Sequence, residues 1–396
     1  MYMKYFFTIL FFIATINTSK AQDSSHLRIS LLTCTPGTEL YSTFGHSALR
    51  IIDSTSLTDY VFNYGTFNFD DEGFYLKFVQ GKLLYYLSAE QYKQFAYDYE
   101  AEGRGITEQV LAYTPTQKMA IQKAMMNNIK EANKYYLYDF FKDNCTTRLR
   151  DIIVQNKPTN TALKAIAPAT LTYRQAIHYY LDMYKKYWSK LGIDLLLGQP
   201  TDAVMTAPET LFLPNNLMRA LDSSNNQGQW ILSKKAAYNF TAPAIQGQLL
   251  TPLFCFSLLL VIILAISFVV SRPAAYFLQG FDAMLFFLTG ALGIVLIFMW
   301  VATNHAMCAH NYNLLWAIPT HAIMAFFVRS KKKWARYYFG CTAVAMVLLL
   351  LSWFFLPQKM NNDFVPFVLL LLYRAAACYY NFQPKNKLNY YATKPS

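Results

Sequence analysis

Charged side chains are scarce in this chain of 396 residues, where Lys, Arg, Asp and Glu together make up only 15%. Hydrophobic residues account for 54%, which is more than an ordinary soluble protein carries. The excess lies at the extreme N-terminus and after residue 248, while the segment between them mixes polar and apolar residues. This distribution excludes an ordinary soluble protein and indicates a globular domain joined to a membrane domain.

Cysteine is sparse as well: the chain has six, with neither a CxxC pair nor a His/Cys cluster at zinc-binding spacing. A metal site formed by His305 and His310 is a weaker alternative. Nucleic-acid-binding motifs, internal repeats and low-complexity stretches are missing from the sequence too. Positive loops beside membrane spans explain part of the formal net charge of +12. We therefore expect no cofactor, no bound metal and no nucleic-acid partner.

The N-terminal segment 1–21 is typical of a secretory signal peptide. Lys4 gives it a positive start, an apolar stretch follows that is too short for an ordinary membrane span, and Ala21 is a small residue at the expected cleavage site. The alternative is an uncleaved anchor. Both interpretations place the domain that follows, residues 22–247, outside the cytoplasm.

Five apolar runs in residues 248–380 are predicted to be membrane helices, because a bilayer core needs about 20 apolar residues in a helix. Two are slightly short, and they would cross nearly upright or borrow flanking residues. Backbone groups in lipid must bond internally, so we expect this domain to be entirely α-helical, with residues 381–396 as a cytoplasmic tail. The runs cover residues 249–270, 281–303, 312–328, 335–356 and 364–380.

Lys and Arg in the loops predict the side of the membrane on which each loop lies. The segment Arg329–Arg336 is rich in basic residues, and the end of the chain adds Arg374 and several lysines, whereas Asn304–Asn311 has neither Lys nor Arg. The positive-inside rule places the basic segments in the cytoplasm. We therefore expect a multi-pass protein of the bacterial inner (cytoplasmic) membrane whose globular domain is in the periplasm.

Two motifs in the globular domain carry reactive side chains. In YSTFGHSALRIID we expect a strand that begins at His46, and the next strand, which contains Asn63, pairs with it as a hairpin. In YDFFKDNCTTRLRDIIV we expect a helix that is capped by Asn144 or the preceding Asp and holds Cys145 in its first turn. This hairpin brings Asn63 near the His46 ring.

These residue types suit acyl transfer by a thiol. A helix N-terminus lowers a thiol pKa, which is about 8.5 in free cysteine, and its N–H groups stabilise an oxyanion. An imidazole within reach takes the thiol proton and returns it to the leaving group. We therefore predict Cys145 as nucleophile, His46 as acid–base and Asn63 as the group that orients the imidazole. The predicted substrate-binding residues flank them and are Asn144, Arg148, Arg150 and Tyr64.

Structural interpretations of the same residues stay open at this point. A lone His at a strand start is usually structural or simply exposed, and a lone Cys at a helix start is usually inert. An Asn before Tyr-Gly is often only a turn former, and Arg148 and Arg150 could form a solvated helix face. Cys34 and Cys145, the two cysteines of the exported domain, could instead form a disulfide in an oxidising compartment.

The motifs GHSALRI and DNCTTRLRD resemble the permuted papain-like superfamily, which includes the lecithin:retinol acyltransferase type and the NlpC-type peptidases. The chain is more similar still to the lipoprotein N-acyltransferases of the Lnb type. The motifs that carry this resemblance are LLTCTPGTELYSTFGHSALRI, DYVFNYGTFNF, FYLKFVQGKLLYYL, GRGITEQVLAYT and YDFFKDNCTTRLRDII. It implies an α+β permuted papain-like (NlpC-like) periplasmic domain followed by an all-α five-helix transmembrane domain. His46, Cys145 and Asn63 match the GH, NC and NYG positions.

The resemblance also implies a reaction. Cys145 would take an acyl chain from a membrane phospholipid as a thioester and pass it to the α-amine of a diacylglyceryl-cysteine on an apolipoprotein. The implied partners are a phospholipid donor, a diacylated apolipoprotein acceptor and the membrane. The rivals are a membrane-anchored papain-like thiol peptidase or amidase of the cell envelope and a non-catalytic envelope scaffold. The polar segment Asn304–His321 could line a lipid path or only cap helices.

Overall fold

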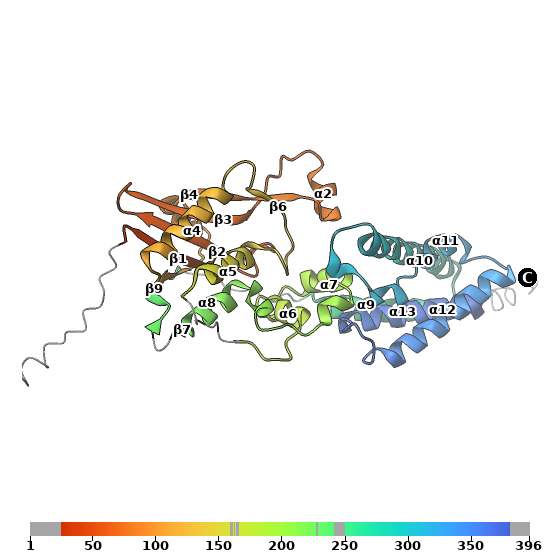
Figure 1. Ribbon diagram of the computed structural model, residues 1–396. Coiled ribbons are helices and arrows are strands. Elements are labelled where there is room, and N and C mark those ends of the chain that lie inside the picture. Colours follow the sequence, from red (N-terminus) through yellow and green to blue (C-terminus); the bar gives the residue numbers. More distant parts are fainter. Residues whose placement is uncertain are drawn as a thin grey trace, which may run out of the picture.

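The computed structural model describes residues 25–158, 161, 163, 166–226, 229–240 and 250–380. The predicted signal peptide and the predicted cytoplasmic tail lie outside these residues. Figure 1 shows an elongated molecule with a β-sheet at one end, a helical bundle at the other, and helices α6 and α7 between them.

The sheet has seven strands in the order β6-β4-β3-β2-β1-β5-β9, and all neighbours are antiparallel. The predicted hairpin is confirmed, because β2 and β3 pair directly. The strands are β1 (Leu27–Cys34), β2 (His46–Asp53), β3 (Thr58–Thr66), β4 (Leu84–Gln91), β5 (Ile106–Leu111), β6 (Tyr135–Leu137) and β9 (Leu232–Tyr238), and a separate two-stranded sheet pairs β7 (Asn225–Asn226) with β8 (Gln229–Trp230).

Helices cover both faces of the sheet: successive side chains point to opposite faces, and the central strands β1 and β2 are buried almost continuously along their length. On one face Leu31 and Leu49 belong to a core that includes residues of α4, α5 and α8, and on the other Leu32 and Ala48 pack with Phe95 of α3. The predicted helix with Cys145 in its first turn is therefore a central packing element. These helices are α3 (Tyr92–Ala101), α4 (Pro115–Asn128), α5 (Cys145–Asn156) and α8 (Pro214–Asp222).

The helices between the sheet and the bundle form a third core around Tyr173, Ile177 and Phe212. The chain reverses between α6 and α7 at Lys185, whose φ of 53° is in the left-handed region. These helices are α6 (Tyr173–Met183), α7 (Tyr187–Leu196) and the short η1 (Gln199–Asp202) and η2 (Glu209–Phe212), and α2 (Phe74–Gln80) lies apart at the tip of the sheet domain (Figure 1).

Three helical segments of the described bundle are long and apolar enough to cross a membrane: Arg272–Val301, Lys333–Ser352 and Asn362–Tyr380. A fourth apolar helix, Pro252–Ser267, is shorter. They correspond to four of the five predicted spans. The bundle helices are α9 (Pro252–Ser267), α10 (Arg272–Val301), α12 (Lys333–Ser352), η6 (Asn362–Phe364) and α13 (Val365–Tyr380).

The remaining predicted span, 312–328, is not one continuous helix, and that prediction is corrected here. The segment consists of η4 (Tyr312–Leu315), α11 (His321–Met324) and η5 (Ala325–Phe327), and residues 316–320, which include Pro319, separate η4 from the contiguous α11 and η5. Proline lacks the N–H and the backbone freedom that a helix interior needs. Irregular backbone is tolerated at membrane depth where protein covers it, and this segment packs along α10. Five membrane crossings stay a prediction.

Small residues allow that close packing. A Cβ atom at Gly290 would lie 2.0 Å from the backbone nitrogen of Ala322, and one at Gly293 would lie 2.0 Å from the carbonyl oxygen of Ala317.

The placement of Arg374 among the cytoplasmic charges is also corrected. This residue lies within α13 and binds Asp282 of α10 through two hydrogen bonds of 2.6 and 2.8 Å.

The loops at one end of the bundle hold the sheet domain. The Asn311 side chain donates to the carbonyl of Leu195 at 2.8 Å, and that of Asn361 donates to the carboxylate of Asp194 at 2.8 Å. Arg174, which is fully buried, donates to the same carboxylate at 2.7 Å. The loops that were predicted to lie outside the cytoplasm are therefore on the same side as the globular domain. The basic segment 329–336 is separated from them by the length of α12.

Candidate active site

Cys145 is the first residue of α5, as the capping pattern predicts. The carbonyl oxygen of the Asn144 side chain accepts the N–H groups of Thr146 and Thr147, both at 2.8 Å. Its amide donates to the carbonyls of Phe140 and Phe212 at 2.7 and 3.0 Å. An Asn side chain has two donor hydrogens and two acceptor sites, so Asn144 has none left for a substrate. The structure makes it a cap that fixes the position of Cys145.

His46 opens strand β2 and lies between Cys145 and Asn63. Its imidazole is hydrogen-bonded to the Cys145 thiol, and its Nε2 atom is 3.1 Å from the side-chain oxygen of Asn63. The hydroxyl of Thr146 donates to that of Ser47 at 3.0 Å and joins the start of α5 to β2. The structure therefore brings together the three residues that were predicted as the catalytic set.

Glu90 of β4 adds a residue that sequence reasoning missed. The Asn63 amide nitrogen donates to its carboxylate at 2.9 Å. A carboxylate accepts only hydrogens, so this bond turns the amide oxygen of Asn63 toward His46. The Nε2 atom of His46 then carries the hydrogen, and Nδ1 is left for the thiol. The pairing of β3 with β4 is the signal that identifies Glu90, which lies in the gap between two of the motifs quoted above.

The environment favours a charged thiolate–imidazolium pair. Burial alone would raise the pKa of the Cys145 thiol, but the charge and hydrogen bond of His46, together with the Ser47 N–H, lower it to about 7. Burial likewise opposes charge on His46, but the facing Cys145 and the hydrogen bond that His46 donates to the Asn63 oxygen raise the pKa of His46 above its ordinary value. Each group therefore stabilises the charged form of the other.

Cys34 is a second thiol near the site, but its setting differs. It pairs with His46 across β1 and β2 and is fully buried. Burial raises the pKa of Cys34 to about 12, although a hydrogen bond with Tyr99 works in the opposite direction. Cys34 and Cys145 are both free, so the alternative of a disulfide between them is not what the structure shows.

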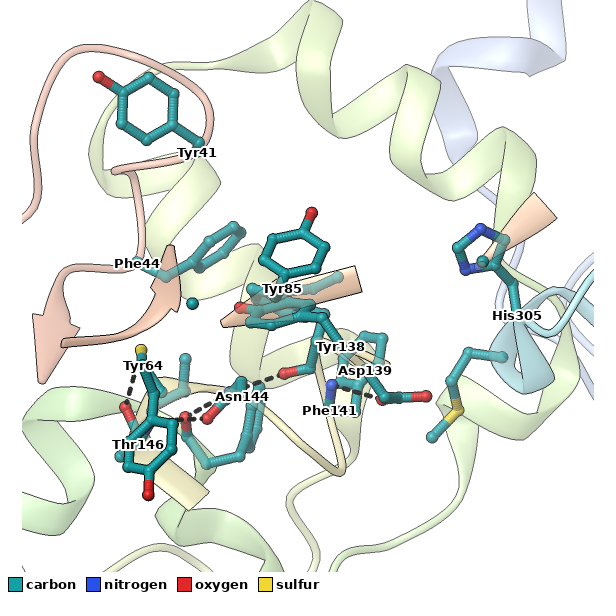
Figure 2. A pocket seen from close by; sticks show the side chains of 18 of the residues that line it. Tyr41, Phe44, Tyr64, Tyr85, Tyr138, Asp139, Phe141, Asn144, Thr146 and His305 are labelled. Carbon is teal, nitrogen blue, oxygen red and sulfur yellow. Dashed lines mark hydrogen bonds between the residues drawn. The ribbon is translucent and has the colours of Figure 1, made fainter. Parts of the chain in front are cut away.

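The Cys–His pair opens into a cavity of about 460 Å³. Cavities that hold small ligands are roughly 300–1,000 Å³, so this one is of ligand size. Figure 2 shows the rings of Phe44, Tyr85 and Tyr138 between Thr146 on one side and His305 on the other. Most of the lining is aromatic or aliphatic, and its aromatic members are Tyr41, Phe44, Tyr64, Phe67, Phe78, Tyr85, Tyr138, Phe140, Phe141 and Phe212.

The predicted substrate-binding residues separate into two groups. Tyr64 and Asn144 line the cavity. Arg148 instead holds Asp143 through two bonds of 2.6 and 2.7 Å and lies 3.5 Å from the centre of the Tyr136 ring. Arg150 binds Asp151 and the carbonyl of Pro208. The structure does not place either arginine on the cavity wall.

The polar segment after α10 has several separate roles. His305–Cys308 lines the far side of the cavity, and the Nε2 atom of His305 is 3.1 Å from the Phe78 carbonyl. The His310 ring packs against Trp300. The two histidines that were weighed as a metal pair thus contact different partners. The next residues, including Asn311, hold α7, so the segment both lines the cavity and joins the two domains.

Comparison with known families agrees with this division of the chain. Residues 15–182 match the Lnb N-terminal periplasmic domain, and residues 244–386 match the Lnb transmembrane domain. No curated protein and no solved structure matched. The first match contains the Cys–His pair and most of the sheet, and the second contains the whole bundle. The chain is therefore a membrane protein with a periplasmic domain, and it belongs to the Lnb family.

Proposed function

We propose that this protein is a lipoprotein N-acyltransferase that carries an acyl chain from a membrane phospholipid to an apolipoprotein on Cys145. One observation supports it most: a polarised Cys–His pair opens into an apolar cavity that reaches the outer end of a membrane helix. Both substrates of such an enzyme have their acyl chains in the bilayer. Membership of the Lnb family, which suggests an enzyme that modifies lipoproteins, supports the proposal as well.

In the first step the thiolate of Cys145 attacks the carbonyl carbon of a phospholipid ester. The carbon–oxygen bond breaks, His46 gives its proton to the departing oxygen, and a lysophospholipid leaves the thioester behind. In the second step the α-amine of a diacylglyceryl-cysteine attacks the thioester. His46 accepts a proton from the amine, the amide forms, and the thiolate of Cys145 is released. Dividing the transfer in two lowers the barrier of each part.

The first turn of α5 supplies a donor for the oxyanion that forms in both steps. The side-chain oxygen of Asn144 accepts the N–H groups of Thr146 and Thr147, and its backbone carbonyl accepts the N–H of Arg148. No acceptor within the described residues takes the N–H of Cys145. A free N–H at the start of a helix is a suitable oxyanion donor, so we assign this role to Cys145 itself.

The cavity also separates this proposal from a thiol peptidase or amidase with the same Cys–His pair. Hydrolysis needs water at the acyl-enzyme, whereas transfer to an amine is favoured where water is excluded. Ten aromatic side chains line the cavity. Tyr64 is the predicted substrate-binding residue that we retain as a wall of the acyl site. Asn144 and Arg148 are assigned to positioning of the Cys145 loop.

The test is mass spectrometry of the N-terminal peptide of a reporter lipoprotein, in a strain that depends on this protein. We expect Cys145→Ala to abolish N-acylation, and Cys145→Ser to do the same or nearly so. Cys341→Ala, which removes an exposed thiol of α12, is the matched control and keeps it. An unchanged N-acylated peptide from Cys145→Ala would reject the mechanism and favour a scaffold. A hydroxylamine-sensitive acyl group on Cys145 would show the thioester directly.

A further inference from the structure

Helix α2 exposes an unusually apolar surface for so short a segment. Only Phe74 is buried, whereas Tyr75, Leu76 and Val79 are 79%, 61% and 41% exposed, and Phe69 in the preceding loop is 68% exposed. Exposed apolar side chains that cluster in this way mark a site of contact with a protein or a membrane. We call the four exposed residues Phe69, Tyr75, Leu76 and Val79 the α2 patch.

The position of α2 indicates what covers this patch. The N–H of Asn304 donates to the carbonyl of Gln80 at 2.9 Å, and His305 bonds to that of Phe78. Asn304 is three residues beyond the end of α10, the longest membrane-spanning helix of the bundle. A residue just past such a helix lies at the surface of the bilayer. Figure 1 shows α2 at the tip of the sheet domain, beside this end of α10.

The same helix forms part of the cavity wall. Phe78 and Gly81 line the cavity together with His305 and Met307 from the bundle. Gly81 permits this close approach, because its φ is +68° and a Cβ atom there would lie 3.1 Å from the Cβ of Asn304. One face of α2 is therefore turned to the cavity, and the α2 patch is on the outside at the level of the bilayer surface.

We propose that the α2 patch inserts into the leaflet that faces the periplasm, and that an acyl chain enters the cavity between α2 and the loop Asn304–Met307. This deepens the proposed function and rests on it for the identity of the ligand. Charge near α2 is mixed, with Lys77 and Lys82 beside the acidic run 70–72. Apolar burial therefore drives the insertion, and the lysines meet lipid phosphates.

A photocrosslinking experiment tests insertion without any reference to activity. The full chain is placed in phosphatidylethanolamine/phosphatidylglycerol nanodiscs, with Leu76 replaced by p-benzoylphenylalanine. Leu57 is the matched control, because it is 89% exposed and lies in the turn before β3, whereas the chain reaches α2 after the other end of that strand. We expect the yield of lipid adducts at position 76 to be more than about ten times the yield at position 57. Strand β3 lies between the two positions and rises about 3.3 Å per residue, so it carries position 57 away from the bilayer surface. Equal yields, or no adduct at position 76, overturn the proposal.

A second measurement links the α2 patch to lipid delivery. The double variant Leu76→Asp with Val79→Asp is expected to slow N-acylation of a diacylated reporter peptide in proteoliposomes about tenfold, because charge is costly in the bilayer. Alkylation of Cys145 by iodoacetamide stays at the wild-type rate, and Leu57→Asp leaves both rates unchanged. Unimpaired N-acylation in the double variant overturns the role of α2. N-acylation that persists in Cys145→Ala instead overturns the proposed function, whatever α2 does.

Discussion

At the scale of single residues, two thiols of the sheet domain show how local contacts set reactivity. Cys34 and Cys145 lie near the same histidine, but only Cys145 is hydrogen-bonded to it. Burial raises the pKa of Cys34 to about 12, while His46 lowers that of Cys145 to about 7. The nucleophile in thiol chemistry is the thiolate. The contacts of each sulfur, and not exposure alone, therefore decide which thiol reacts.

We expect the alkylation of Cys145 by iodoacetamide to rise through a midpoint near pH 7, because the thiolate forms as the pH passes the lowered pKa. His46→Ala removes the imidazolium and should move the midpoint upward. Cys34 is the internal control and stays unlabelled over the same range. The measurement is peptide mapping of alkylated protein across pH. A midpoint of Cys145 that does not move in His46→Ala would contradict the ion pair.

Glu90 is expected to act as a positioning residue through Asn63. Glu90→Ala leaves the Asn63 amide free to rotate, so kcat/KM should fall about tenfold, which is the size of one lost orienting hydrogen bond. Glu90→Gln keeps an oxygen acceptor and should restore most of the activity. The midpoint of Cys145 alkylation should rise in Glu90→Ala and return in Glu90→Gln. Loss of activity with an unmoved midpoint would reduce Glu90 to a role in stability.

At the scale of elements, hydrophobicity and helix continuity are separate properties. The run 312–328 is apolar enough to be predicted as a span, but Pro319 and the close contact with α10 produce short helical turns. The start of α5, by contrast, could be predicted from the sequence, because Asn144 caps the helix within a local motif. Local chemistry therefore predicted where α5 begins, and packing decided the form of the third apolar run.

Gly290→Ala tests the packing of that broken segment on α10. The new Cβ atom would meet backbone 2.0 Å away, which cannot rotate aside, so we expect a loss of roughly 1–3 kcal/mol of stability. The measurement is thermal unfolding in detergent or nanodiscs. Gly280→Ala in the same helix is the matched control, because nothing lies within 4 Å of its Cβ position. It should be neutral or gain up to about 1 kcal/mol from helix propensity. Equal behaviour of the two variants would contradict the close contact.

At the scale of the whole molecule, buried polar contacts join the two domains. Asp194 accepts from Arg174 of the sheet-side helices and from Asn361 of the bundle. Removing one partner of a buried ion pair is costly, because it leaves an unpaired charge. These contacts hold the sheet-side helices against the loops of the bundle. The loop charges predicted the side on which the sheet domain lies, but the contacts that hold it there come from residues far apart in the sequence.

The orientation of the bundle can be tested with two exposed lysines. Lys359→Cys places a thiol in a loop that contacts the sheet-side helices, and Lys331→Cys places one in the basic segment at the other end of α12. A membrane-impermeant maleimide added to spheroplasts should label position 359 and spare position 331, because the positive-inside rule holds the basic segment in the cytoplasm. Permeabilisation should then expose position 331. Labelling of position 331 in intact spheroplasts would reverse the topology.

The sequence by itself determined the order of domains, the start of α5 and the candidate pair His46 and Cys145, because these depend on composition, capping and local motifs. The tertiary structure alone decided the role of Glu90, the diversion of Arg148 to Asp143, the break in the third apolar run and the joint wall that α2 and the bundle give the cavity. Glu90 meets Asn63 27 residues away and α2 meets the bundle more than two hundred residues away, spacings that carry no periodic signal, whereas Arg148 binds Asp143 only five residues away. Local preferences act over a few residues, whereas packing joins residues more than a hundred positions apart.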